Sequence, residues 1–330
     1  LYPAVPVLGV LLTLLVISQM ARVIVVIGSG IIGLGVVWYV GYARSRTVGE
    51  GLVRTALRGE PADPYRVVVP IANPETQHGL LRLAAATAHA NAEHGTPELV
   101  AVNVVEGPEE APLQNIESER TDHQRDLFEH AHDIADAVDV QLRTRAIVAP
   151  EIGPAILDVI AQENAAQVLL GWHGALGEAG GTFGHTIDPV VERASCAVSL
   201  VDLRRETIGA PVALVAPGQN APVVARRAAE FARADGAVPT LLYVQPPDTD
   251  ADGRAVVDGI ALEAGLDPDE YEVEVLVNED VEAALLAAVE EYDTVCIGLS
   301  ARIDRSGVVY GTVTEHVADH VSGNVALIRG

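Results

Sequence analysis

The stretch Val168-Leu-Leu-Gly-Trp-His-Gly174 decides the fold, because an apolar strand runs there directly into a glycine-rich loop. Gly184-His-Thr186 follows, and a helix is expected to open just behind it. The same spacing returns as Val295-Cys-Ile-Gly298-Leu-Ser-Ala301 and then Gly311-Thr312. Backbone N–H groups in such loops, backed by a helix N-terminus, suit an anion such as phosphate. The chain is therefore expected to hold two copies of one unit.

Around each loop, the pattern predicts strands that alternate with helices. The strands of the first copy are expected at 66–71, 98–105, 140–148, 167–170 and 197–201, and its helices at 75–93, 120–137, 151–163 and 187–194. The second copy predicts strands at 212–216, 238–244, 271–277, 293–297 and 324–328, and helices at 221–233, 253–264, 280–291 and from 313. Crossovers of this length favour parallel pairing. The predicted fold class is α/β, with two tandem five-stranded doubly wound sheets, helices on both faces, and ligand loops at the carboxyl ends of the strands.

The composition is acidic and lysine-free. The 330 residues carry a formal net charge of -25, and all 21 basic residues are arginine. A dense negative surface of this kind suggests adaptation to high salt, and we expect a halophilic archaeal origin. The sign of the charge argues against a nucleic-acid partner, because binding a polyanion needs a basic face. A hydrophobic fraction of 49% is ample for packed cores.

The first segment is expected to lie in the membrane. Residues 1–21 and 23–43 carry no charge and are separated by Arg22 alone. Each run has about the 20 residues that a helix needs to cross a bilayer. A cluster of arginines follows the second run, and such a bias places that end in the cytoplasm: Arg44, Arg46, Arg54 and Arg58. The sequence thus predicts a transmembrane helical hairpin over 1–46 in the cell membrane, with the chain from about 44 onward cytoplasmic.

An alternative interpretation of this segment stays open. Gly28-Ser-Gly30-Ile-Ile-Gly33 matches the fingerprint G-x-G-x-x-G of flavin and NAD enzymes, and Glu50 follows about 20 residues on. The residues before the motif are wholly uncharged, however, and the supposed helix after it has no charged solvent face. Small residues in transmembrane helices usually serve close helix packing. The membrane interpretation is the one that the residues favour.

Two family resemblances follow from these motifs. The strand, the loop G-x2-G-x9-G-(S/T), the helix and the closing apolar strand resemble the universal stress protein (UspA-like) family, first over 65–204 and again over 205–330, behind a linker at 47–64. The apolar hairpin that ends in Gly41-Tyr-Ala-Arg-Ser-Arg46 resembles the last two helices of amino acid–polyamine–organocation (APC) permeases. Together they resemble the haloarchaeal permeases that carry such domains at their end.

The resemblance implies a regulatory role in stress response rather than an enzyme, with ATP or another adenine nucleotide as ligand and no metal. The residues that match the family's nucleotide loops are Gly171, Gly174, Gly184, His185, Thr186, Gly298, Gly311 and Thr312. The family's aspartate after the first strand is replaced by Ala72 and by Ala216, and Glu178 places a negative charge within the first loop. A scaffold that dimerises the transporter and binds no small molecule therefore remains the alternative.

The expected partners are the bilayer, the missing permease helices of the same or a neighbouring chain, and a second copy as a homodimer. Family members pair through their last strands, so the two repeats are expected to form an internal pseudo-dimer through 197–201 and 324–328. A metal site at His130 and His132 is not expected, because on a helix the two side chains point about 200° apart. The transported substrate cannot be named from these residues.

Overall fold

The computed structural model describes residues 64–107, 118–172, 183–249, 252–299, 302–304, 307–309 and 312–330. These residues belong to one compact unit, Ala62–Gly330. The expected transmembrane hairpin over 1–46, nearly all of the linker, and the motif at Gly28–Gly33 lie outside the described residues. None of the helices within the described ranges combines the length and the apolar character needed to span a bilayer.

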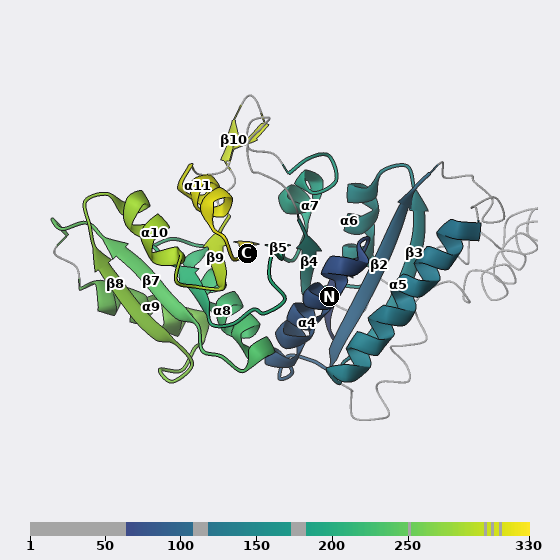
Figure 1. Ribbon diagram of the computed structural model, residues 1–330, viewed down its shortest axis with the longest axis horizontal. Coiled ribbons are helices and arrows are strands. Elements are labelled where there is room, and N and C mark those ends of the chain that lie inside the picture. The colour runs from purple at the N-terminus through teal and green to yellow at the C-terminus, as the bar shows by residue number, and fades with distance from the viewer. Residues whose placement is uncertain are drawn as a thin grey trace, which may run out of the picture. The chain divides into compact units, whose positions relative to one another are not determined.

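The first half of this unit alternates strands and helices as the sequence predicted (Figure 1). Its elements are β1 Tyr65–Pro70, α4 Pro74–Ala90, β2 Pro97–Glu106, α5 Ser118–Ala137, β3 Gln141–Ala149, α6 Ile152–Gln162, β4 Gln167–Gly171, α7 Asp188–Arg193 and β5 Ala197–Asp202. Local sequence sets the helix starts. At α4, for example, Asn73 Oδ1 accepts the N–H of Glu75, and Pro74 opens the first turn, where its missing N–H costs nothing.

The second half repeats this order. Its elements are β6 Pro211–Leu214, α8 Ala221–Ala232, the 3₁₀ helix η3 Arg233–Asp235, β7 Thr240–Gln245, α9 Gly253–Ala264, β8 Glu272–Val277, α10 Val281–Val289, β9 Thr294–Gly298, β10 Arg302–Asp304, β11 Gly307–Val309, α11 Thr312–His320 and β12 Asn324–Arg329. The antiparallel pair β10–β11 lies within the second glycine loop and was not predicted. The other strands and helices fall where the pattern placed them, with ends that differ by a few residues.

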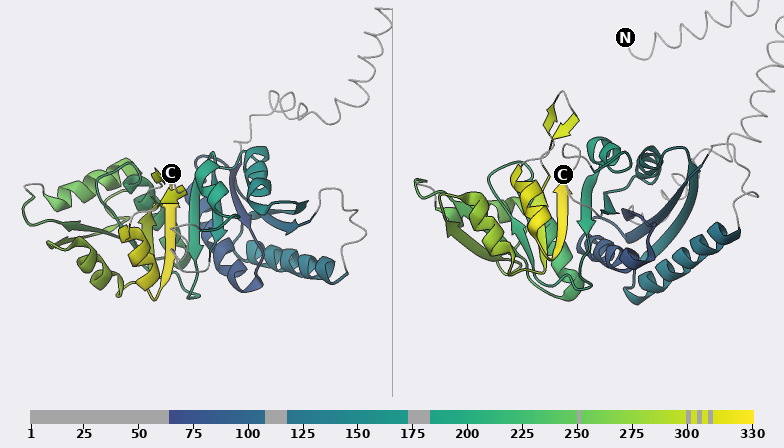
Figure 2. Two further views of the ribbon diagram at one scale, coloured as in Figure 1. Left: turned by 90° about the horizontal axis from the view of Figure 1, so that it is seen from above. Right: turned by 45° about the horizontal axis from the view of Figure 1, so that its top comes forward.

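The ten long strands form one sheet in the order β3-β2-β1-β4-β5-β12-β9-β6-β7-β8. All neighbours are parallel except β5 and β12, which pair antiparallel at the centre (Figure 2). The pairing expected between 197–201 and 324–328 is thus confirmed. Each half contributes five strands in the same order, so the two halves meet edge to edge through their last strands.

The pairing has local twofold symmetry. The N–H of Trp172 bonds to the carbonyl of Val201, and the N–H of Leu299 bonds to that of Ile328, so these positions correspond in the two halves. One residue earlier, Leu200 lies directly opposite Leu327. Because Leu200 and Leu327 also correspond to each other, the twofold axis of the tandem passes through this pair.

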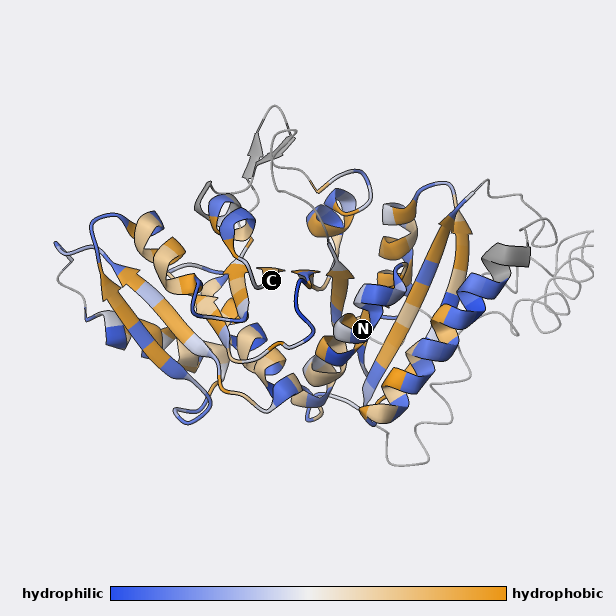
Figure 3. Ribbon diagram, viewed as in Figure 1, coloured by the Kyte–Doolittle hydropathy of each residue, from blue (hydrophilic) through white to orange (hydrophobic). Residues whose placement is uncertain are grey.

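Helices cover both faces of the sheet, and a separate core fills each face. One core lies under α4, α5, α8 and α9, and the other under α6, α7, α10 and α11; each extends across both halves. Figure 3 shows the strands as mostly hydrophobic and the outer side of α5 as hydrophilic. Burial of apolar surface on two faces at once is typical of a parallel sheet, and explains why its strands are near-continuous apolar runs.

Candidate functional site

A cavity opens at the carboxyl ends of β1 and β4 in the first half. Its volume is about 390 Å³. The candidate residues Gly171, Gly184, His185 and Thr186 all line it, as does Ala72, two residues after the end of β1. The remaining candidate of this loop, Gly174, lies outside the described residues. The structure therefore brings the described part of the first predicted motif together around one cavity.

The loop end beside this cavity is held in place by local contacts. Trp172 and Phe183, which flank the undescribed part of the loop, pack edge to face with ring centroids 5.4 Å apart. Gly184 has a φ of +94°, a backbone conformation that only glycine adopts readily. The N–H of Phe183 donates to Asp188 Oδ1 at 2.8 Å. The carboxylate of Asp188, in the first turn of the short helix α7, is thus bonded to the backbone at the end of the loop.

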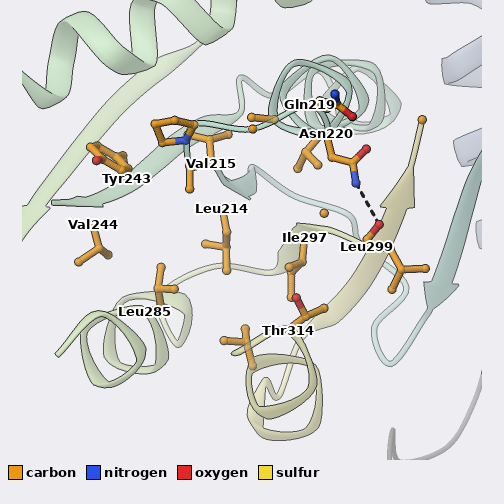
Figure 4. Close-up of a pocket in the computed structure, with 18 of the residues that line it drawn as sticks. Leu214, Val215, Gln219, Asn220, Tyr243, Val244, Leu285, Ile297, Leu299 and Thr314 are labelled. Atoms are coloured by element: carbon orange, nitrogen blue, oxygen red, sulfur yellow. Dashed lines mark hydrogen bonds between the residues drawn. The ribbon is translucent and has the colours of Figure 1, made fainter. Parts of the chain in front are cut away.

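The second half holds a larger cavity in the corresponding place, with a volume of about 660 Å³. The candidate Gly298 lines it at the end of β9, and Thr314 contributes from α11 (Figure 4). Thr312 begins α11, while Gly311 lies outside the described residues. Asn220 Nδ2 donates to the carbonyl of Leu299 at 3.0 Å and ties the start of α8 to the loop that follows β9.

The two cavities occupy equivalent positions of the repeat. Gly171 ends β4 as Gly298 ends β9, and a Cβ placed on either glycine would meet a side chain of the first helix of its half, at 2.9 Å from Leu80 Cδ1 and at 3.3 Å from Val224 Cγ2. Ala72 and Ala216 each lie two residues after the first strand of their half, and each lines its cavity. The alanines that the sequence placed at the family's aspartate positions therefore lie at the two cavities.

The electrostatics of the two cavities differ. Among the described residues that line the first cavity none is an acid or an arginine, and the polar side chains are His185 and Thr186. The described lining of the second cavity also lacks a side-chain carboxylate, but it includes Gln219 and Asn220. Arg329 lines this cavity too, with its guanidinium bonded to the carbonyls of Val191 and Ala194. The amide side chains can hold and orient a ligand through hydrogen bonds. Within the described ranges, no group of three or more His, Cys, Asp and Glu residues is arranged to hold a metal ion.

Sequence reasoning missed most of the cavity walls. Part of the apolar walls comes from the first two turns of α6 and α10, namely Ile152 and Ile156 in the first half and Val281 and Leu285 in the second. These residues have the spacing of ordinary core positions, so no signal in the sequence separates a wall residue from a core residue. Asn220 was missed for a similar reason, because an Asn before a helix is a common N-cap.

Comparisons with known proteins found a family match and similar solved structures. Residues 65–202 match the universal stress protein family. The solved structure of a universal stress protein from Archaeoglobus fulgidus superposes with a TM-score of 0.55 at 15% identity, over 79% of this chain and 97% of that chain. The cytoplasmic domain of a prokaryotic cation chloride cotransporter aligns over 80% of this chain and 95% of that chain, with a TM-score of 0.49 and 11% identity.

A curated relative is a transport protein. The Na⁺/H⁺ antiporter NhaS5 of Synechocystis is 23% identical over 276 residues, which make up 81% of this chain and 38% of the antiporter. The chain therefore spans less than half the length of this relative, which is a different class of transporter from the APC permease that the hairpin suggested. The strand order, the paired cavities and the family match lead to one conclusion: residues 65–202 of this chain form a universal stress protein domain.

Proposed function

We propose that this chain is the regulatory part of a membrane transport protein, with a tandem of universal stress protein folds attached to the membrane. The observation that carries the proposal is the similarity to part of a longer antiporter. At most 61 of the 276 aligned residues can precede Ala62, so most of the alignment falls on the tandem. The tandem is thus the portion that this chain shares with a transport protein.

The proposed attachment is the apolar hairpin over 1–46, with the tandem on the cytoplasmic side. The arginines that follow the hairpin support this orientation, because positive residues flank the cytoplasmic ends of transmembrane helices. The partners in this arrangement are the bilayer and the remaining transporter helices, in the same chain or a neighbouring one. A role in regulation rather than catalysis is supported by the described cavity linings. Their apolar walls and few polar side chains can bind a small molecule through fit and hydrogen bonds.

The proposed signal is an adenine nucleotide or a related small molecule. Both cavities fall within the range of about 300–1,000 Å³ that is usual for small-molecule sites. The second cavity is the better candidate, because it is larger and its lining includes the amide side chains of Gln219 and Asn220. In the first half, the acidic Asp188 lies in the first turn of α7, where its negative charge disfavours a phosphate. This assignment favours Gly298, Thr312 and their neighbours over the loop of the first half.

Binding is tested with two matched variants of the 330-residue chain, purified in a mild detergent. Ala72 and Ala216 are both exposed and correspond in the two halves, so Ala72→Phe narrows the first cavity and Ala216→Phe the second. ATP at 100 times its Kd should stabilise the wild type by about 2.7 kcal/mol, read as a rise in the melting temperature. We expect Ala216→Phe to abolish this rise and Ala72→Phe to keep it. A wild-type chain that shows no shift with any adenine nucleotide contradicts the proposed ligand.

Attachment is tested by fractionation of the same chain expressed in cells. The proposal predicts that it floats with membranes in a density gradient and resists alkaline extraction, whereas deletion of residues 1–46 releases it. A full chain found in the soluble fraction contradicts the membrane part of the proposal. A flavin or NAD enzyme built on Gly28–Gly33 would instead retain a coloured or fluorescent cofactor through purification.

The second candidate function is a scaffold without a ligand. It is favoured by the alanines at both strand ends, because no carboxylate of the described lining faces either cavity. If the tandem is such a scaffold, nucleotides change the melting temperature of neither the wild type nor the two cavity-filling variants. It also predicts that truncation of the tandem changes the oligomeric state of the transporter rather than its dependence on nucleotide.

A further inference from the structure

A separate cavity, here called the joint cavity, is lined by residues of both halves. Its volume is about 300 Å³, and it shares no lining residue with the two cavities at the carboxyl ends of the strands. Its lining includes Arg82 and His89 of α4 and Arg233 of η3, whereas no carboxylate belongs to the described lining. Small and apolar side chains complete it, among them Ala85, Ala86 and Val138.

This lining departs from the composition of the chain, which has 46 acidic residues and only 21 arginines. Two other cavities of the described part follow that composition. One is lined by Glu98, Asp136 and Asp139 together with Arg143, and the other, beside β8, by Glu274 and Glu291. A cavity with two arginines and no carboxylate in its described lining therefore suits an anionic ligand better than its neighbours do.

Arg82 is held in place through one nitrogen of its guanidinium. Its Nη2 donates to Asp235 Oδ1 at 2.5 Å and to the carbonyl of Ala234 at 2.9 Å. Asp235 is shared with the backbone, because its Oδ2 accepts the N–H groups of Ile208 and Gly209 at 2.7 and 2.9 Å. Nε and Nη1 of Arg82 find no acceptor among the described residues, so an oriented guanidinium keeps donors for a ligand.

Arg233 is arranged in the same way. Its Nη2 donates to Glu270 Oε1 at 2.8 Å, and Glu270 Oε2 accepts the N–H of Asp267 at 3.0 Å. Nε and Nη1 of Arg233 likewise have no acceptor within the described ranges. His89 donates through Nε2 to the carbonyl of Val138 at 3.0 Å, which leaves its Nδ1 as a further hydrogen-bonding atom.

The carboxylates that pair with the two arginines do not fill the joint cavity. Neither Asp235 nor Glu270 belongs to its lining, and each also accepts backbone N–H groups of its own half. Hydrogen bonds from guanidinium groups to phosphate oxygens are among the strong ones, and a phosphate group offers several acceptor oxygens to donors from different elements. The volume lies at the lower end of the range for small-molecule sites, which favours a ligand smaller than a nucleotide.

We propose that the joint cavity binds a phosphate group, carried by inorganic phosphate or by a small phosphate monoester. Arg82 and Arg233 supply the N–H donors, and His89 Nδ1 accepts the hydroxyl of a monoprotonated phosphate. Arg82 belongs to the first half and Arg233 to the second, so the bound ligand contacts both halves. This site is distinct from the proposed nucleotide cavities and does not depend on them.

The test follows the melting temperature of the 330-residue chain in a mild detergent, while sodium phosphate replaces sodium chloride at constant ionic strength. Arg233→Gln should raise the phosphate concentration needed for half of the maximal rise by about tenfold or more, because a charged donor is lost. Arg205→Gln is the matched control and should titrate like the wild type. Arg205 is 41% exposed against 46% for Arg233, and each has one ion-pair partner, Asp293 and Glu270. General salt effects of phosphate act on both variants alike. Equal titration of the two would overturn the proposal.

Two further variants locate the response. Ala86→Leu narrows the joint cavity without changing a charge and should abolish the saturable rise, whereas Ala216→Phe narrows the second cavity and should keep it. The opposite result would assign the phosphate to the nucleotide cavity and overturn the joint site. Phosphatidic acid added to the micelles tests a lipid source of the same group. A response to this lipid that requires Arg233, without a response to phosphate, would overturn the assignment to a soluble ligand.

Discussion

Arg204 and Arg329 make reciprocal contacts across the centre of the sheet. Arg204 leaves the last strand of the first half and donates through its guanidinium to the carbonyls of Ala318 and Val321 at the end of α11. Arg329, in the last strand of the second half, donates to the carbonyls of Val191 and Ala194 at the end of α7. Each half thereby caps the last helix of the other, where four carbonyls lack partners within the helix and a positive charge is favourable.

Removal of this cap should destabilise the tandem. For Arg329→Met we expect a loss of about 1.5–3 kcal/mol in the free energy of unfolding, because two carbonyls lose hydrogen bonds from a charged donor. Urea denaturation measures the loss. Arg254→Met is the control: its partner Asp258 lies 3.8 Å away on the exposed side of α9, and such a pair contributes about 0.3–0.5 kcal/mol. Equal losses would show that Arg329 is not a structural cap.

A side chain on Gly184, beside the first cavity, should lower the stability of the fold because of the backbone conformation alone. A Cβ on Gly184 would meet no atom within 4 Å, but its φ is +94°. We expect Gly184→Ala to cost about 1–2 kcal/mol. Gly259→Ala should instead stabilise by about 0.5–1 kcal/mol, because Gly259 lies exposed within α9 at a helical conformation. Thermal melts of the two variants should therefore shift in opposite directions.

Asp235 should make the tandem sensitive to acid. Burial alone would raise the pKa of its carboxyl, but the N–H groups of Gly209 and Ile208 and the guanidinium of Arg82 outweigh this and lower it. A lowered pKa in the folded state gives stability that is present above the unfolded value of about 3.9 and is lost as the pH falls through the folded value. Asp235→Asn should reduce the slope of stability against pH in that range. An unchanged slope would contradict this assignment, and Asp122→Asn on the exposed face of α5 serves as the control.

The two cysteines should resist thiol reagents in the folded protein. Burial raises the pKa of Cys296 to about 12 and that of Cys196 to about 11, so little reactive thiolate forms at neutral pH. Cys296 is fully buried in β9, and in a Cys196→Ser variant its labelling by a chromogenic disulfide should proceed only as fast as the protein unfolds. Labelling that is fast in native buffer and unchanged in urea would contradict the buried position.

The sequence determined the secondary structure and most of the topology. Apolar runs bounded by glycine and proline placed the strands, and the repeated loops at Gly171 and Gly298 identified two copies of one unit. The final strand of each copy was correctly expected at the joint, because the resemblance to the universal stress protein family implies pairing through the last strands. The lack of an aspartate at Ala72 and Ala216 is also evident from the sequence, because it depends only on the position just after a strand.

The tertiary structure alone decided which of the two cavities at the carboxyl ends of the strands is larger, and which side chains join the two halves. The contacts that settle these points join residues that are more than a hundred positions apart: Asn91 with Glu230, Arg329 with Val191, and Arg204 with Val321. Periodicity records whether a position is buried within its own helix or strand. It does not record which side chain of another element will face that position, because the crossovers of the parallel sheet and the antiparallel joint at the centre fix that neighbour only once the chain has folded.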